Sequence, residues 1–166
     1  MSNSLSLLTL NVNGMRDSQK RSRIFQFCKS LGVDFALLQE THIVNQDEVH
    51  TWSFEWGGGL HASFGSTSSC GTVILVSPRW TSLVGKVDSD HEGRLVCITI
   101  KHPSGSFLLC NVYAPIGLQT GGTFSLPCHP SFLAVPLVSW PETLTASPTH
   151  ASIECPHVLF QAVVMA

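Results

Sequence analysis

The sequence predicts a mixed α/β fold, and two observations support this. A short apolar run, an amphipathic segment and a second apolar run follow one another within about 35 residues, which is typical of a strand–helix–strand unit. Further on, residues 71–77, 93–100 and 106–113 are rich in apolar and β-branched side chains and are separated by Pro and Gly, as in consecutive strands. With 166 residues, of which 43% are hydrophobic, the chain can build one ordinary domain.

The first unit predicts two parallel strands. Residues 5–10 form an apolar run too short for a helix, and it ends at the turn-forming pair Asn13-Gly14. Residues 33–38 form the second run. A right-handed crossover makes two such strands parallel neighbours. Asn11 and Glu40 then emerge at the same edge of the sheet, where their oxygen atoms suit a hard divalent cation.

Between these strands, the pattern of apolar residues predicts a helix over residues 18–31. Its apolar positions recur at i, i+3, i+4 and i+7: Ile24, Phe27, Cys28 and Leu31. Asp17 or Ser18 is placed to cap the start, and Gly32 to end the helix. By contrast, residues 52–69 change to Gly, Ser and Trp, and this composition predicts a loop.

The content of charged residues changes at Pro115. Residues 1–115 hold all nine Lys and Arg and nine of the Asp and Glu, whereas residues 116–166 hold only Glu142 and Glu154. A solvent-facing surface normally carries charge, so we expect a non-homologous, poorly ordered tail over 116–166, in which no element is placed. The net charge of −2 excludes a global attraction to nucleic acid and leaves only local binding.

The cysteines and the amino terminus indicate an intracellular protein, nuclear or cytoplasmic. The start of the chain lacks a basic, apolar secretory signal, and no run reaches the roughly 18 apolar residues of a membrane span. Cys28, Cys70, Cys97 and Cys110 are therefore expected to be reduced thiols within the core. Depending on register, Cys97 and Cys110 face each other across a hairpin turning at residues 103–105. Nothing in the sequence indicates a membrane partner or an oligomer.

Five short motifs carry a family resemblance. In chain order they are Leu-Thr-Leu-Asn-Val-Asn-Gly at 8–14, Leu-Leu-Gln-Glu-Thr-His at 37–42, Gly-Thr-Val-Ile-Leu-Val-Ser at 71–77, Glu-Gly-Arg at 92–94 and Asn-Val-Tyr-Ala-Pro at 111–115. In this order and spacing they resemble the endonuclease/exonuclease/phosphatase superfamily. The resemblance is strongest to the apurinic-type endonuclease domain of long interspersed retrotransposons, and it covers residues 5–115.

The resemblance implies part of a four-layered α/β sandwich, in which two packed mixed β-sheets are flanked by helices, with a divalent-metal phosphodiesterase site across the sheet edges. Glu40 resembles the carboxylate that binds Mg²⁺, or Mn²⁺ in its place, and Asn11 the amide that supports the metal and the attacking water. Tyr113 resembles the phenol that hydrogen-bonds the scissile phosphate. The alternatives are an exposed Glu, an Asn chosen for its turn, and a rim aromatic.

Two further residues have open roles in this resemblance. Arg94 either faces phosphate or pairs with a carboxylate at a strand start. Asn13 either contacts the substrate or serves only the turn. The triplet Ser89-Asp90-His91 matches the motif that comes last in the sequences of this family, but here it precedes a middle strand. We therefore interpret it as a coincidental turn.

The later motifs of the family are absent after Pro115, above all a Gly-Asp-Phe-Asn block that aligns and activates the nucleophile. The resemblance therefore implies an incomplete endonuclease domain that is catalytically inactive as it stands, and whose parent activity is Mg²⁺-dependent nicking of DNA. Two alternatives remain open. One is another phosphodiesterase or phosphatase of the superfamily, and the other is a non-catalytic fragment that binds nucleic acid or a protein partner.

Overall fold

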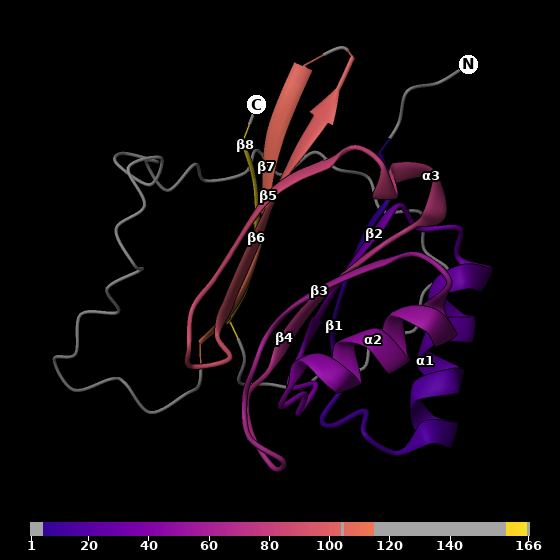
Figure 1. Cartoon of the computed structure of the whole chain (residues 1–166), viewed down its shortest axis with the longest axis vertical. Helices are drawn as coiled ribbons and strands as arrows, with labels where there is room; N and C mark the ends of the chain where they lie inside the picture. Colours follow the sequence, from indigo (N-terminus) through magenta and orange to yellow (C-terminus); the bar gives the residue numbers. More distant parts are fainter. Residues whose placement is uncertain (1–4, 104, 115–158, 166) are drawn as a thin grey trace, which may run out of the picture. The chain divides into compact units, whose positions relative to one another are not determined.

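The computed structural model describes residues 5–103, 105–114 and 159–165 (Figure 1). Its elements follow the chain in this order: β1 (Leu7–Asn11), α1 (Ser18–Ser30), β2 (Phe35–Gln39), α2 (Gln46–Trp56), β3 (Gly59–Ser63), β4 (Thr72–Val76), α3 (Pro78–Thr81), β5 (Val84–Ser89), β6 (Leu95–His102), β7 (Gly105–Ala114) and β8 (Leu159–Met165). None of the helices in these ranges has the length and apolarity needed to cross a bilayer.

The first sheet has the strand order β1-β2-β4-β3. β1 and β2 are parallel and joined through α1, as predicted, and Asn11 lies opposite Gln39. β4 runs antiparallel to both β2 and β3, so the sheet is mixed. The carboxyl ends of β1 and β2 therefore lie at one edge, beside the start of β4.

Helix α1 forms where its periodicity predicted it. The Asp17 side chain accepts a hydrogen bond from the Lys20 backbone N–H at 2.8 Å, which satisfies one free donor of the first turn. Phe25 and Cys28 are buried on the face that packs against the first sheet. The buried thiol of Cys28 has its pKa raised to about 11 by loss of solvent, so it stays neutral.

The predicted loop over 52–69 is wrong, because this region contains the end of α2 and all of β3. The Asn45 side chain caps α2 by accepting from the Glu48 N–H at 2.9 Å, and Gly57 ends the helix with φ of 79°. The buried side chains recur with a helical period: Val49, Trp52 and Trp56. Composition alone did not predict this helix, because the Trp residues that suggested a loop form part of its buried face.

The second sheet has the order β5-β6-β7-β8, and each neighbouring pair is antiparallel. β6 and β7 form the predicted hairpin, in which Cys97 lies directly opposite Cys110. The two residues form a disulfide, so the expectation of reduced thiols is wrong for this pair. The sequence left the register of this hairpin open, and the observed register brings the two sulfur atoms together.

Strand β8 also departs from prediction, because no element was expected after Pro115. It pairs with β7 from Leu108↔Met165 to Ala114↔Leu159. Its sequence is an apolar run containing adjacent valines, and the free edge of β7 offers it backbone hydrogen bonds. The rest of the predicted tail, 116–158 and 166, lies outside the described residues, so the domain boundary at 115 remains a prediction.

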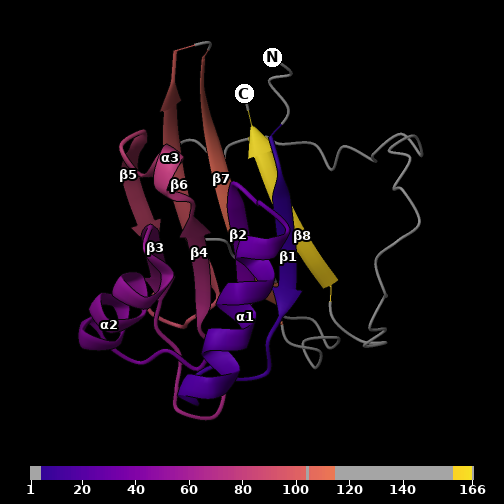
Figure 2. The same ribbon diagram turned by 90° about the vertical axis from the view of Figure 1, so that its right-hand side faces the viewer.

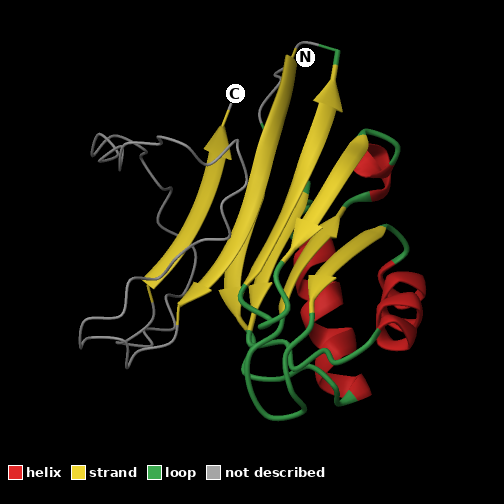
Figure 3. Ribbon diagram, turned by 60° about the vertical axis from the view of Figure 1, so that its left-hand side comes forward, coloured by secondary structure: helices red, strands yellow, loops and turns green. Residues whose placement is uncertain are grey.

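Two apolar cores hold these layers together. One lies between α1 and α2 and the first sheet, and includes Phe25, Leu38 and Trp52. The other lies between the two sheets and includes Leu37, Ile98 and similar residues. Figures 2 and 3 show both helices on the side of the first sheet that faces away from the second. The predicted α/β class, with two packed sheets and outer helices, is confirmed.

Candidate active site

Glu40 and Tyr113 meet where the two sheets come together. Glu40 directly follows β2, and Tyr113 lies near the end of β7. The Tyr113 phenol donates a hydrogen bond to Glu40 Oε1 at 2.6 Å, although 73 residues separate the two in sequence. Among the described residues, no donor contacts the second carboxylate oxygen, Oε2. The carboxylate is thus held by one oxygen.

The environment of Tyr113 favours its neutral form. The residue is only 8% exposed. Burial raises the pKa of the phenol well above its ordinary value, and the hydrogen bond to Glu40 and the charge of that carboxylate raise it further, while Arg94 lowers it by a smaller amount. Tyr113 therefore keeps its proton and acts as a hydrogen-bond donor at neutral pH.

Asn11 lies beside Glu40 through the pairing of β1 with β2. It ends β1 opposite Gln39, the residue that precedes Glu40. Asn11 Oδ1 accepts from the Asn13 N–H at 3.0 Å, which fixes the side-chain amide at the sheet edge. Asn13 is exposed, has φ of 44°, and its carbonyl accepts from Lys20 Nζ at 2.7 Å. The structure thus shows Asn13 in a turn.

Arg94 lies next to Tyr113 on the second sheet, since its carbonyl accepts from the Tyr113 N–H at 2.8 Å. Its guanidinium pairs with Glu92 at 3.0 Å. Its Nε is buried and has no hydrogen-bond partner in the described part of the chain. A buried N–H without a partner costs about 1–3 kcal/mol. Arg94 therefore makes the carboxylate pair, which was one of the two roles left open by the sequence, and its Nε still lacks an acceptor among the described residues.

The loops around Glu40 carry local backbone strain. In the described ranges, four non-glycine residues have positive φ angles: Asn13, Glu40, His42 and Cys70. All four lie in the loops after β1, after β2 and before β4. Backbone hydrogen bonds tie these loops together: Gly14 N to Glu40 O at 2.6 Å, and His42 N to Cys70 O at 3.0 Å. Such strain persists only where the surroundings enforce it, and it is common at functional sites.

Gly93 of the Glu-Gly-Arg motif brings the second sheet against these loops. It has φ of 73°, and a Cβ atom there would lie 2.7 Å from the Gly71 nitrogen. The Gly93 carbonyl accepts from that same N–H at 2.9 Å. This close approach explains the glycine next to Arg94.

In the triplet Ser89-Asp90-His91, Ser89 ends β5, and Asp90 and His91 lie in the connection between β5 and β6. The Asp90 carboxylate accepts from the Arg94 and Leu95 backbone N–H groups at 3.1 Å each and from the Ser63 hydroxyl. Asp90 therefore organises the turn before β6.

The donor set around Glu40 suits a hard cation held largely by water and substrate. The residues that the structure describes contain no group of three or more His, Cys, Asp or Glu able to hold a metal. One carboxylate oxygen of Glu40 and the amide oxygen of Asn11 remain as candidates. Mg²⁺ is often bound by one or two carboxylates, with waters and phosphate oxygens completing its shell. The residues fit such a loosely held ion.

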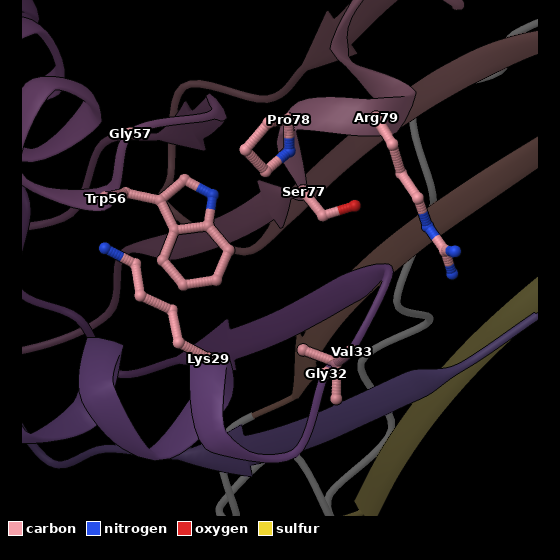
Figure 4. A pocket seen from close by; sticks show the side chains of 8 residues that line it. All are labelled: Lys29, Gly32, Val33, Trp56, Gly57, Ser77, Pro78 and Arg79. Atoms are coloured by element: carbon pink, nitrogen blue, oxygen red, sulfur yellow. The ribbon is translucent and has the colours of Figure 1, made fainter.

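One cavity among the described residues lies elsewhere. It measures about 570 Å³ and is lined by Lys29, Gly32, Val33, Trp56, Gly57, Ser77, Pro78 and Arg79 (Figure 4). Val33 precedes β2 and Ser77 follows β4, so this cavity lies at the opposite end of these strands from Glu40. It does not belong to the candidate active site.

Two residues near the site were not predicted to have a role. Gln39 and Asn111 are both buried, and their side chains are hydrogen-bonded to each other at 2.7 Å. Each lies within a motif, Gln39 just before Glu40 and Asn111 two positions before Tyr113. A polar residue inside an otherwise apolar strand was the available signal.

The sequence model described as "Endonuclease/Exonuclease/phosphatase family" matches residues 8–137. The chain belongs to this family. The match to the family extends beyond Pro115, where the predicted domain ended. The resemblance inferred from the five motifs is therefore confirmed.

Two similar proteins refine the relationship of this family member. A transposon TX1 protein of 149 kDa from Xenopus laevis is 33% identical over 111 residues, which is 67% of this chain and 8% of that protein. The crystal structure of an AP endonuclease from Leishmania major has a TM-score of 0.51 at 20% identity. It covers 67% of this chain, and the chain covers 40% of that protein. The chain thus spans less than half of either relative.

Proposed function

We propose that this chain carries the metal-binding and phosphate-contacting part of a DNA endonuclease of retrotransposon type. The observation that carries the proposal is the contact between Glu40 and Tyr113, which joins the two sheets at the edge where Asn11 also lies. The transposon relative supports the retrotransposon branch over other phosphodiesterases of the family. DNA inside the cell is the proposed substrate.

Glu40 is the proposed ligand of Mg²⁺, with Mn²⁺ as a substitute, and Asn11 is its proposed neighbour. The chain's membership of the family supports a divalent metal at this position, as the resemblance of its motifs implies. Glu40 Oε2, which accepts no hydrogen bond from the part of the chain that the structure describes, offers a hard anionic oxygen. The Asn11 amide is already oriented by its bond to the Asn13 N–H. When bound, the ion would neutralise the charge of a phosphodiester.

Tyr113 and Arg94 are the proposed phosphate contacts. The phenol stays protonated, but its single O–H points to Glu40 in this structure, so binding of a phosphate oxygen requires the hydroxyl to turn away from Glu40. Arg94 contributes its partly exposed guanidinium, which pairs with Glu92 in this structure, while its buried Nε would reach a phosphate only if the side chain moved. Asn13, exposed at the same edge, is placed to contact the DNA backbone through its side-chain amide.

We further propose that these 166 residues alone do not hydrolyse DNA at an appreciable rate. In-line attack needs a positioned and deprotonated water, and loss of a general base costs roughly a hundredfold to ten-thousandfold in rate. The described ranges contain no group of three or more His, Cys, Asp or Glu, so they show no acidic cluster that could serve both the metal and a general base. The Gly-Asp-Phe-Asn block is absent from the sequence.

A plasmid-nicking assay tests this proposal. Supercoiled DNA is incubated with Mg²⁺ and either the wild-type chain or Glu40→Ala, and open-circle product is measured over time. We expect the wild-type chain to form no more open-circle product than Glu40→Ala does. Clear nicking that depends on Glu40 would show that the chain is an active endonuclease and would overturn its proposed inactivity.

A further inference from the structure

A pair of buried amide side chains lies directly behind the candidate active site. Gln39 is 2% exposed and Asn111 is 0% exposed. Gln39 comes from β2 of the first sheet, and Asn111 comes from β7 of the second. Gln39 Nε2 donates to Asn111 Oδ1 at 2.7 Å across 72 residues of sequence. The pair therefore connects the two sheets from within.

Asn111 also holds the backbone of two strands in the opposite sheet. Its Nδ2 donates to the Leu38 carbonyl and to the Val73 carbonyl, each at 2.9 Å. These carbonyls belong to β2 and β4, which are themselves neighbours. Through one side chain, β7 is thus fixed against a particular peptide unit on each of the two strands.

Gln39 extends the network to β1. Besides Asn111, its Nε2 is within 3.1 Å of the Thr9 hydroxyl and of the Leu37 carbonyl. Thr9 lies on the strand that ends at Asn11. The network thus reaches all three strands of the first sheet that border the site, together with β7.

Hydrogen bonds of this kind fix position in a way that the surrounding core does not. Leu37, Ile74 and Leu109 belong to the intersheet core, where packing is close but the hydrophobic effect has no direction and does not require particular partner atoms. Buried amides need their particular partners, since an unsatisfied group is costly. Asn111 uses both its Oδ1 and its Nδ2, whereas Gln39 Oε1 has no partner among the described residues. A slip of one residue along a strand is about 3.3 Å, which is enough to separate the Tyr113 hydroxyl from Glu40.

We infer that Gln39 and Asn111 are positioning residues, which lock β7 against β2 and β4 so that the Tyr113 hydroxyl meets the Glu40 carboxylate. The inference rests on the proposed function, because it treats the Tyr113 hydroxyl and the Glu40 carboxylate as parts of one site. Neither amide touches the substrate. Each acts through the backbone of the strand that carries a site residue: Gln39 adjoins Glu40, and Asn111 precedes Tyr113 by two positions on the same face of β7.

The experiment replaces Asn111 with leucine in the full chain and follows ionisation of the phenol. Tyr113 is the only tyrosine in the chain, so tyrosinate absorbance after a rapid pH jump reports on this residue alone. Asn111→Leu is expected to move the ionisation midpoint by about one pH unit or more toward that of free tyrosine, which is near 10. The circular dichroism spectrum of the β-sheets, recorded near neutral pH, should remain unchanged.

Leu109→Ala is the matched control. Leu109 lies two residues earlier on the same face of β7 and is also 0% exposed, but makes no side-chain hydrogen bond. The substitution lowers stability to unfolding while leaving the midpoint of Tyr113 in place, which separates positioning from general destabilisation. An equal shift in Leu109→Ala would overturn the inference.

Gln39→Met is the second variant, because it removes the Gln39 amide and leaves the two bonds from Asn111 to the backbone. A smaller shift in the same direction is expected. Unchanged midpoints in both Asn111→Leu and Gln39→Met, with a shifted midpoint in Glu40→Gln, would overturn the positioning role alone. The nicking assay and metal binding test the proposed function separately, since the phenol titration requires neither metal nor activity.

Discussion

The Tyr113 hydroxyl donates a hydrogen bond to Glu40 Oε1 at 2.6 Å and joins the end of β7 in one sheet to the end of β2 in the other. This contact brings together two motifs that are distant in sequence. It also gives the site a spectroscopic probe, because the chain contains no other tyrosine.

Glu40→Gln is expected to lower the pH at which Tyr113 ionises. The carboxylate raises the pKa of the phenol through its hydrogen bond and its charge, and both effects weaken in the amide, whereas burial remains. Because the folded pKa is raised, the contribution to stability is present below about pH 10 and is lost as pH rises through the folded value. Tyrosinate absorbance after a pH jump measures the midpoint. Asp47→Asn, which removes an exposed carboxylate of α2, serves as control. A midpoint in Glu40→Gln equal to that of the wild type would refute the contact.

Glu55→Gln is expected to reduce stability by about 1–3 kcal/mol at neutral pH, because Arg21 is only 6% exposed and loses a charged partner. Arg21 Nε and Nη2 each lie 2.7 Å from a Glu55 oxygen. Urea unfolding measures the change.

Acid should remove the difference in stability between the wild type and Glu55→Gln. The hydrogen bond from Arg21 lowers the pKa of Glu55 below its ordinary 4.5, so the stabilisation is present above that value and is lost as pH falls through the folded pKa. The gap between wild type and Glu55→Gln should therefore shrink below about pH 4. A gap that stays constant with pH would mean that the ion pair does not stabilise the fold.

Replacing both Cys97 and Cys110 with alanine is expected to cost about 2–3 kcal/mol of stability under oxidising conditions, as for a short closed loop. The two residues are 13 apart in sequence. Adding a reductant to the wild type should produce a similar loss. Peptide mapping after alkylation without reductant should find both residues unmodified. Complete alkylation of both would instead restore the original expectation of reduced thiols.

Asn45→Ala is expected to cost about 1 kcal/mol, because it removes the side-chain cap of α2. Phe54→Ala on the same helix is a suitable control, since Phe54 is 90% exposed and its loss should change stability by less than about 0.5 kcal/mol. Chemical unfolding compares the two. Equal effects would show that the cap contributes nothing to α2.

The first strand, helix and second strand could be predicted because their signals are local. The spacing of Ile24, Cys28 and Leu31 and the cap at Asp17 act within one helix, and strand β2 is apolar up to Leu38. Phe27, which was predicted for the same face, is 45% exposed, and Phe25 is buried in its place. Helix α2 could not be recognised from composition, since its Trp residues become a buried face only when packed on the first sheet. Strand β8 depends on pairing with β7 at long range.

The site residues were predicted by family resemblance, and the structure adds their contacts. Glu40 and Asn11 share a sheet edge, as the parallel pairing of β1 and β2 required. The contact of Glu40 with Tyr113 and the pairing of Gln39 with Asn111 each join residues more than 70 positions apart. Such contacts depend on how the two sheets pack, which periodicity within one strand does not encode.

Binding of Mn²⁺ tests the proposed metal ligand most directly. Titration followed by electron paramagnetic resonance, in which bound Mn²⁺ loses its sharp signal, is carried out on wild type, Glu40→Gln and the exposed control Glu92→Gln. The expected result is one weak site in wild type and Glu92→Gln that disappears in Glu40→Gln. Equal binding by all three proteins, or no binding by wild type, would contradict the assignment of Glu40 as the metal ligand.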